Sequence, residues 1–138
     1  MNDRIMIDTN LWVYFFSQIR TTKHQTVYQL IEEKFEWIFS STQILGELYN
    51  VLTKKNLVNK DQANYIVLQM IDAFPVLGIE TETILKSIEI NKHYQYSYWD
   101  SSIIATALLN DCRYLYTEDL QHDQLIENTL KIVNPFRE

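Results

Sequence analysis

The sequence of 138 residues is poor in three residue types, with one cysteine, two glycines and two prolines. The single Cys112 excludes an internal disulfide framework, and it cannot form a thiolate metal site by itself. So little glycine and proline leaves no linker or low-complexity tract, and little room for a Gly-rich phosphate-binding loop. The chain also lacks a signal peptide and a long apolar run, so we expect a cytoplasmic protein that does not span a membrane.

Apolar and acidic side chains, in contrast, are abundant. Hydrophobic residues make up 46% of the chain, which at this length favours one compact domain over residues 1–138. The formal net charge is -6. An acidic chain disfavours a protein that coats nucleic acid, because sequence-independent affinity for phosphates comes from Lys and Arg. The net charge matters less if several acids gather at one site and bind cations, which reverse the local field.

Three lysines close together, Lys54, Lys55 and Lys60, form a local basic group. One interpretation is that they contact the phosphates of a nucleic-acid backbone. The other is that they form a solvated helix end. The sequence leaves both interpretations open.

Short apolar runs alternate with longer amphipathic ones along the chain. Strands are expected at residues 5–7, 37–39, 75–79, 114–117 and 131–133. Helices are expected at residues 11–16, 22–34, 43–55, 61–73, 81–92, 98–110 and 121–127. Strands separated by helices imply βαβ crossovers, so we predict an α/β fold of three layers, with a mainly parallel sheet of four or five strands and helices on both faces.

Two aspartates follow expected strands. Asp8 ends the apolar run of residues 5–7, and Asp119 follows the strand at residues 114–117 after one intervening acid. In an open parallel sheet, ligands bind outside the carboxyl ends of the strands, so both carboxylates should lie at the same edge. A purely structural role is also open for each, because Asp8 can cap the following helix and Asp119 can be an exposed turn residue.

Two further acids lie on or beside the apolar faces of expected helices. Glu47 lies at the border of a stripe that contains Ile44 and Val51. Asp100 lies in line with the apolar positions 103, 104, 107 and 108, which puts a carboxylate inside the stripe. Burying a carboxylate costs free energy unless it is paired, hydrogen-bonded or metal-bound. The alternatives are a Glu47 that extends to water and a capping box between Ser97 and Asp100.

Four acids from four strand or helix starts would together form a site of hard oxygen ligands, which suits Mg²⁺ or Mn²⁺. Such ions orient a phosphodiester, activate a water and stabilise the leaving oxygen. Without the ions, the crowded negative charges repel one another. We therefore interpret Asp8, Glu47, Asp100 and Asp119 as candidate catalytic and metal-binding residues.

The order and surroundings of these acids resemble those of PIN-domain nucleases. The resemblance is carried by IMIDTN at residues 5–10, ILGEL at 44–48, YWD at 98–100 and YTED at 116–119. It covers nearly the whole chain, whose size is similar to that of the VapC-type toxins of bacterial toxin-antitoxin pairs. The resemblance implies a metal-dependent ribonuclease that uses Mg²⁺ or Mn²⁺ and acts as the toxin of such a pair.

The resemblance also implies roles for neighbouring residues and partners. Asn10 and Thr117 would support metal-bound water or phosphate, while Glu118 could share or take the role of Asp119. The partners would be an RNA substrate and a cognate antitoxin protein. The aromatic run at residues 12–16 offers apolar surface for an antitoxin segment or a second copy of the chain, so we also expect a homodimer.

Two other functions are compatible with the same pattern. One is a catalytically silent PIN-like module that binds nucleic acid or protein, and the other is an RNA-processing nuclease that is not a toxin. A phosphoaspartyl hydrolase fits poorly, because its chemistry needs a second aspartate two residues after Asp8, where this chain has Asn10.

Overall fold

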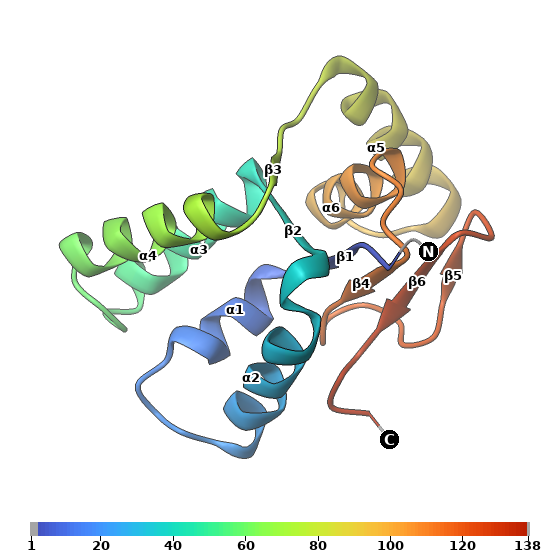
Figure 1. Cartoon of the computed structure of the whole chain (residues 1–138). Helices are drawn as coiled ribbons and strands as arrows, with labels where there is room; N and C mark the ends of the chain where they lie inside the picture. The colour runs from blue at the N-terminus through green and yellow to red at the C-terminus, as the bar shows by residue number, and fades with distance from the viewer. Residues whose placement is uncertain (1–2, 138) are drawn as a thin grey trace.

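The structure is a computed structural model that describes residues 3–137 as a six-stranded sheet with helices packed against it (Figure 1). The strand order is β3-β2-β1-β4-β6-β5, and every neighbouring pair is parallel except β5 with β6. The strands are β1 (Ile5–Ile7), β2 (Ile38–Ser41), β3 (Val76–Leu77), β4 (Tyr114–Tyr116), β5 (Leu125–Ile126) and β6 (Leu130–Val133). The helices are α1 (Thr9–Phe16), α2 (Thr22–Lys34), the 3-10 turn η1 (Phe35–Trp37), α3 (Thr42–Lys54), α4 (Lys60–Ala73), α5 (Thr81–Tyr94) and α6 (Tyr98–Leu109).

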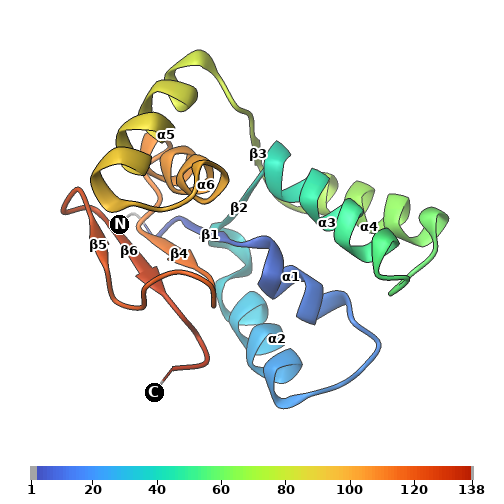
Figure 2. The ribbon, with the colours of Figure 1, turned by 180° about the vertical axis from the view of Figure 1, so that it is seen from behind.

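Helices cover both faces of the sheet, which confirms the predicted α/β fold of three layers (Figures 1 and 2). Helices α1 to α4 lie on one side, while α5 and α6 lie on the other. Because parallel crossovers are right-handed, a chain that moves outward from β1 to β3 and then returns to β4 must change face. The packing agrees, since α1 contacts α2 and α3, whereas α5 contacts α6. No helix within residues 3–137 is long and apolar enough to cross a membrane.

Side-chain caps fix where three of the helices begin. Asp8 accepts a hydrogen bond of 2.7 Å from the first backbone N–H of α1. Ser41 accepts one of 3.1 Å from Ile44 at the start of α3, and Ser97 accepts one of 3.1 Å from Asp100 in α6. Each cap satisfies a backbone donor that the helix leaves unpaired. Because Asp8 follows β1 and Ser41 is the last residue of β2, the first turns of α1 and α3 lie at the carboxyl edge of the sheet.

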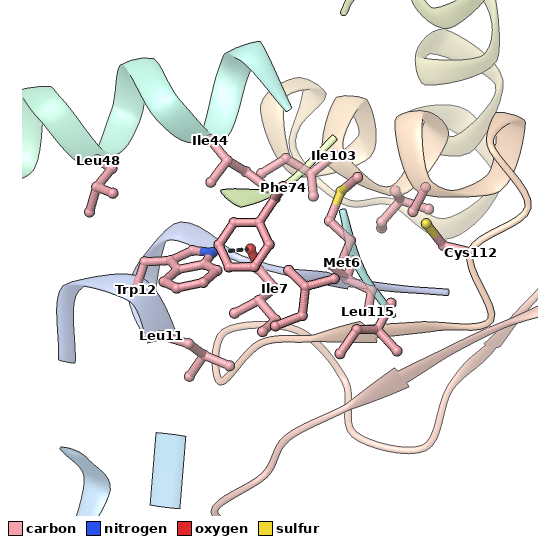
Figure 3. Packing of buried hydrophobic residues seen from close by; sticks show 14 of the residues in the cluster. Met6, Ile7, Leu11, Trp12, Ile44, Leu48, Phe74, Ile103, Cys112 and Leu115 are labelled. Carbon is pink, nitrogen blue, oxygen red and sulfur yellow. Dashed lines mark hydrogen bonds between the residues drawn. The ribbon is translucent and has the colours of Figure 1, made fainter. Parts of the chain in front are cut away.

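The packing around Trp12 holds β1 and α1 together (Figure 3). The Trp12 side chain is 1% exposed, and its Nε1 donates a hydrogen bond of 3.1 Å to the carbonyl oxygen of Ile7. The ring of Phe74, which follows α4, lies with its centroid 5.4 Å from that of Trp12. Buried aromatic pairs of this kind contribute both area and geometry to a core. Asp8, between β1 and α1, is therefore held on a rigid support.

The segment after β4 differs from the sequence prediction. The expected helix at residues 121–127 is wrong, because this segment forms turns and β5, which pairs antiparallel with β6. Asp123, Glu127 and Asn128 have φ angles of 67°, 49° and 61°, which a right-handed helix does not permit. This hairpin gives the sheet one strand more than the four or five predicted. The predicted strand at residues 75–79 is shortened to β3.

Candidate active site

A cleft of about 590 Å³ opens at the carboxyl edge of the sheet, beside α1, α3 and α6. All four predicted acids line it, namely Asp8 after β1, Glu47 in α3, Asp100 in α6 and Asp119 after β4. The prediction that Asp8 and Asp119 share one edge of the sheet is confirmed. Four elements that are distant in the sequence thus direct carboxylates into one cleft.

Asp8 is the most buried of the four acids, with 6% of its surface exposed. Burial raises its pKa to about 6, although hydrogen bonds from the backbone N–H of Thr9 and from the hydroxyl of Thr117 oppose the shift. The negative charges of Glu47 and Asp100 raise the pKa further. Asp8 therefore carries negative charge that its protein partners only partly compensate.

Asn10 and Thr117, the two expected supporting residues, link Asp8 to Asp119. The Thr117 hydroxyl donates to Oδ2 of Asp8 over 2.9 Å. Nδ2 of Asn10 donates to the Thr117 hydroxyl over 3.1 Å and to Oδ2 of Asp119 over 2.8 Å. The backbone N–H of Asp119 also donates to the Thr117 hydroxyl, over 3.2 Å. One buried hydroxyl therefore connects the ends of β1 and β4.

Glu47 is held by two side chains. The hydroxyl of Thr9 donates to its Oε1 over 2.9 Å, and Nε2 of Gln43 lies 3.3 Å from its Oε2. The same Nε2 of Gln43 donates to the carbonyl oxygen of Trp99 over 3.0 Å. Gln43 thus joins α3 to the first turn of α6, beside Asp100. Sequence reasoning missed Gln43, although its place four residues before Glu47 on one helix was a usable signal.

The surroundings of Asp100 distinguish a capping role from a place in the site. Its backbone N–H donates to the Ser97 hydroxyl, so Ser97 does cap α6. Within residues 3–137, however, the Asp100 carboxylate returns no hydrogen bond to the backbone of Ser97, so no reciprocal capping box forms. The carboxylate lines the cleft instead.

Glu118, whose role the sequence left open, has partners of its own. It accepts a hydrogen bond of 2.6 Å from the hydroxyl of Tyr14 and one of 2.8 Å from Nζ of Lys23. Partial burial raises the pKa of Glu118, but the bonds from Lys23 and Tyr14 outweigh this effect and leave the pKa below its usual value. Glu118 is therefore neutralised by a cation of its own chain, whereas its neighbour Asp119 is held by Asn10.

The oxygen atoms that line the cleft are of the chemical type that binds a hard divalent cation. Carboxylates and an amide oxygen are the ligands that Mg²⁺ and Mn²⁺ prefer. Oδ1 of Asn10, which lines the cleft, is buried without a hydrogen-bond partner. Among residues 3–137, no three acidic, histidine or cysteine groups are already spaced to hold a metal ion. Neighbouring side chains donate hydrogen bonds to three of the acids, Asp8, Glu47 and Asp119.

Comparison with known families identifies the family of the chain. A family model described as the PIN domain matches residues 5–127. The chain belongs to the PIN-domain family. The matched residues of this PIN domain contain all four acids of the cleft together with Asn10 and Thr117.

Solved structures share the fold of this PIN domain. The VapC20 toxin of Mycobacterium tuberculosis, described as cleaving the sarcin-ricin loop, is 18% identical with a TM-score of 0.70, over 83% of this chain and 89% of that one. A toxin-antitoxin complex from Klebsiella pneumoniae is 19% identical with a TM-score of 0.71, over 97% and 99% of the two chains. FitAcB from Neisseria gonorrhoeae is 16% identical with a TM-score of 0.72, over the same shares, 97% and 99%. No curated protein sequence matches this one.

Proposed function

We propose that this PIN-domain protein is a metal-dependent endoribonuclease and acts in the cytoplasm as the toxin of a toxin-antitoxin pair. The observation that carries the proposal is the cleft at the carboxyl edge, where four carboxylates from four separate elements lie together. The cleft has the ligand chemistry of a Mg²⁺ or Mn²⁺ site rather than that of a zinc or thiolate site. Toxins are among the solved structures that share the fold, which supports the biological role.

In this proposal Asp8, Glu47, Asp100 and Asp119 hold the divalent cation. The bound cation would orient the phosphodiester and lower the pKa of the attacking water. The chain's own residues supply the positioning, because Thr117 and Asn10 fix the carboxylates that follow β1 and β4. Thr9 holds Glu47 in place by donating a hydrogen bond from its hydroxyl to the Glu47 carboxylate.

An antitoxin is the proposed protein partner. A shallow apolar groove of about 150 Å³ lies between α1, α2 and α4, and its lining includes Phe15, Phe16, Phe35 and Phe74. Phe35 is 51% exposed there, which leaves apolar surface for a partner segment. The structure of similar fold from Klebsiella pneumoniae is a toxin-antitoxin complex. A second copy of the chain is the alternative partner for exposed apolar surface.

The test is cleavage of a panel of cellular RNAs by the purified protein with Mg²⁺, with Mn²⁺ and with EDTA. The proposal expects internal cleavage with either metal and none with EDTA. Binding of RNA without cleavage under all three conditions would favour a catalytically silent PIN module. Metal-dependent cleavage without growth arrest on overexpression would favour an RNA-processing nuclease over a toxin.

A further inference from the structure

Lys55 is the only cationic side chain among the described residues that line the cleft. The same lining contains five acidic residues, because Glu118 joins the four acids of the candidate site. A polyanionic substrate that enters the cleft therefore meets one fixed positive charge of the protein. Among the lining residues, an ionic contact to a phosphate outside the metal site can come only from this lysine.

Lys55 lies at the end of a wall that α3 forms along the cleft. Glu47, Val51 and Lys55 line the cleft at successive spacings of four residues, and Asn50, three residues after Glu47, lines it as well. Lys55 is the C-cap of α3, so the wall extends from Glu47 to the end of the helix. Eight residues of helix separate the two by about 12 Å along the axis. This separation places Lys55 at a phosphate other than the one that a cation on the four acids would bind.

The charge of Lys55 is available to a ligand. Within residues 3–137, the structure gives Lys55 no ion pair and no side-chain hydrogen bond. Lys23 is the contrasting case, because its Nζ is bound to Glu118 and lies over the ring of Tyr14. Lysines at a helix C-terminus also interact favourably with the helix dipole, and that structural role applies equally to Lys54.

We propose that Lys55 binds a phosphate of the RNA backbone beside the scissile one, and that the RNA strand runs along the α3 wall from Glu47 to Lys55. The inference rests on the proposed ribonuclease function and adds the path that the strand takes through the cleft. A contact to a neighbouring phosphate positions the strand without taking part in the reaction. Lys55 is thus a positioning residue for substrate, and its loss acts on binding.

The test compares Lys55→Ala with Lys54→Ala, which removes an adjacent exposed lysine that does not line the cleft. Losing one phosphate contact to a single strand lowers affinity about fivefold at 0.1 M salt and reduces the salt slope by about 0.7. We expect Lys55→Ala to raise KM by this factor and leave kcat and Mn²⁺ binding unchanged. Lys54→Ala should match the parent, and Lys55→Arg should restore KM.

A second measurement separates this inference from the ribonuclease proposal. Binding of a fluorescent single-stranded RNA is followed by anisotropy in the Asp8→Asn background, where no cleavage is expected. The inference expects Lys55→Ala to weaken this binding about fivefold relative to Lys54→Ala. Equal affinities for the two variants would overturn the proposed path of the strand along α3, even if the parent cleaves RNA. An inactive parent whose RNA binding still depends on Lys55 would instead overturn the ribonuclease proposal alone.

Discussion

The hydroxyl of Thr117 donates a hydrogen bond of 2.9 Å to Oδ2 of Asp8, and this contact joins the carboxyl ends of β4 and β1. Both residues are buried. The hydroxyl also accepts hydrogen bonds from Asn10 and from the backbone of Asp119. A single side chain therefore sets the relative positions of two candidate metal ligands.

Replacing Thr117 by valine keeps the shape of the side chain and removes its hydroxyl. We expect Thr117→Val to lower the free energy of unfolding at neutral pH by about 2 kcal/mol, because a buried carboxylate loses a donor. Urea denaturation measures the change. Thr26→Val is the matched control, since the Thr26 hydroxyl donates only to a carbonyl of its own helix, and it should cost less than about 0.5 kcal/mol. Equal losses in the two variants would show that the Thr117 hydroxyl has no special role.

The pKa of Asp8 predicts how the stability of the metal-free protein depends on pH. Asp8 ionises near pH 6 in the folded protein, against 3.8 for an unperturbed aspartate. As the pH rises, the unfolded chain loses this proton first, so the folded state loses stability between about pH 4 and pH 6. Above about pH 6, the ionised Asp8 lowers the free energy of unfolding by about 3 kcal/mol.

Removing the charge should therefore stabilise the metal-free protein. We expect Asp8→Asn to raise the melting temperature in EDTA at pH 7.5 and to have little effect near pH 3.5, as differential scanning calorimetry would measure. The exposed Asp72→Asn provides the control, with a small effect at both pH values. A lower melting temperature for Asp8→Asn than for the parent at pH 7.5 would contradict the conclusion that Asp8 is a buried negative charge.

The bridge that Gln43 forms between Glu47 and Trp99 should matter for metal affinity. Gln43→Met keeps the length of the side chain but removes the donor to both groups. Loss of such an outer partner weakens metal binding by about tenfold, so we expect a Mn²⁺ dissociation constant raised by that factor in calorimetric titration. Gln69→Met is the control, because Gln69 donates to Tyr65 on α4, away from the cleft. A similar Mn²⁺ affinity for both variants would remove Gln43 from the site.

The groove that contains Phe35 tests the proposed antitoxin contact. Co-expression with the product of an adjacent small reading frame should give a stable complex, and Phe35→Glu should abolish it by placing a charge on apolar surface. The variant should keep its ribonuclease activity. Leu68→Glu changes an exposed apolar residue of α4 outside the groove lining and should leave the complex intact. A strict monomer in sedimentation, together with harmless overexpression of the parent alone, would count against the proposed partners.

The sequence predicts the parts of the fold that depend on local pattern. The apolar run before Asp8 ends at a capping residue and the stripe of α3 has a clear helical period, so the strand and the helix form where expected. The β5-β6 hairpin has no such signal, because its turn uses Glu127 and Asn128 at positive φ instead of glycine. A short apolar run after Asp123 is equally compatible with a helix and a strand.

The candidate site also has a part that the sequence predicts and a part that it does not. Asp8 and Asp119 follow β1 and β4, so sheet topology brings them to one edge, and helices α3 and α6 bring Glu47 and Asp100 to the same cleft. The choice between Glu118 and Asp119 depends on Lys23 and Tyr14, which lie far from both in the sequence. The bond from Gln43 to the Trp99 carbonyl likewise joins two distant helices. Contacts of this kind depend on tertiary packing, which the spacing of residues along one chain does not encode.

The rate of RNA cleavage by Asp100→Asn, with Mn²⁺ present, is the decisive measurement for a metal site built from the four acids. Asparagine keeps the shape of Asp100 but removes an anionic ligand, so we expect a rate lower by orders of magnitude in a folded protein. Thermal stability without metal should rise, because the variant removes one of the charges that act on Asp8. Full activity of Asp100→Asn, measured beside an inactive Asp8→Asn, would contradict this assignment and remove Asp100 from the metal site.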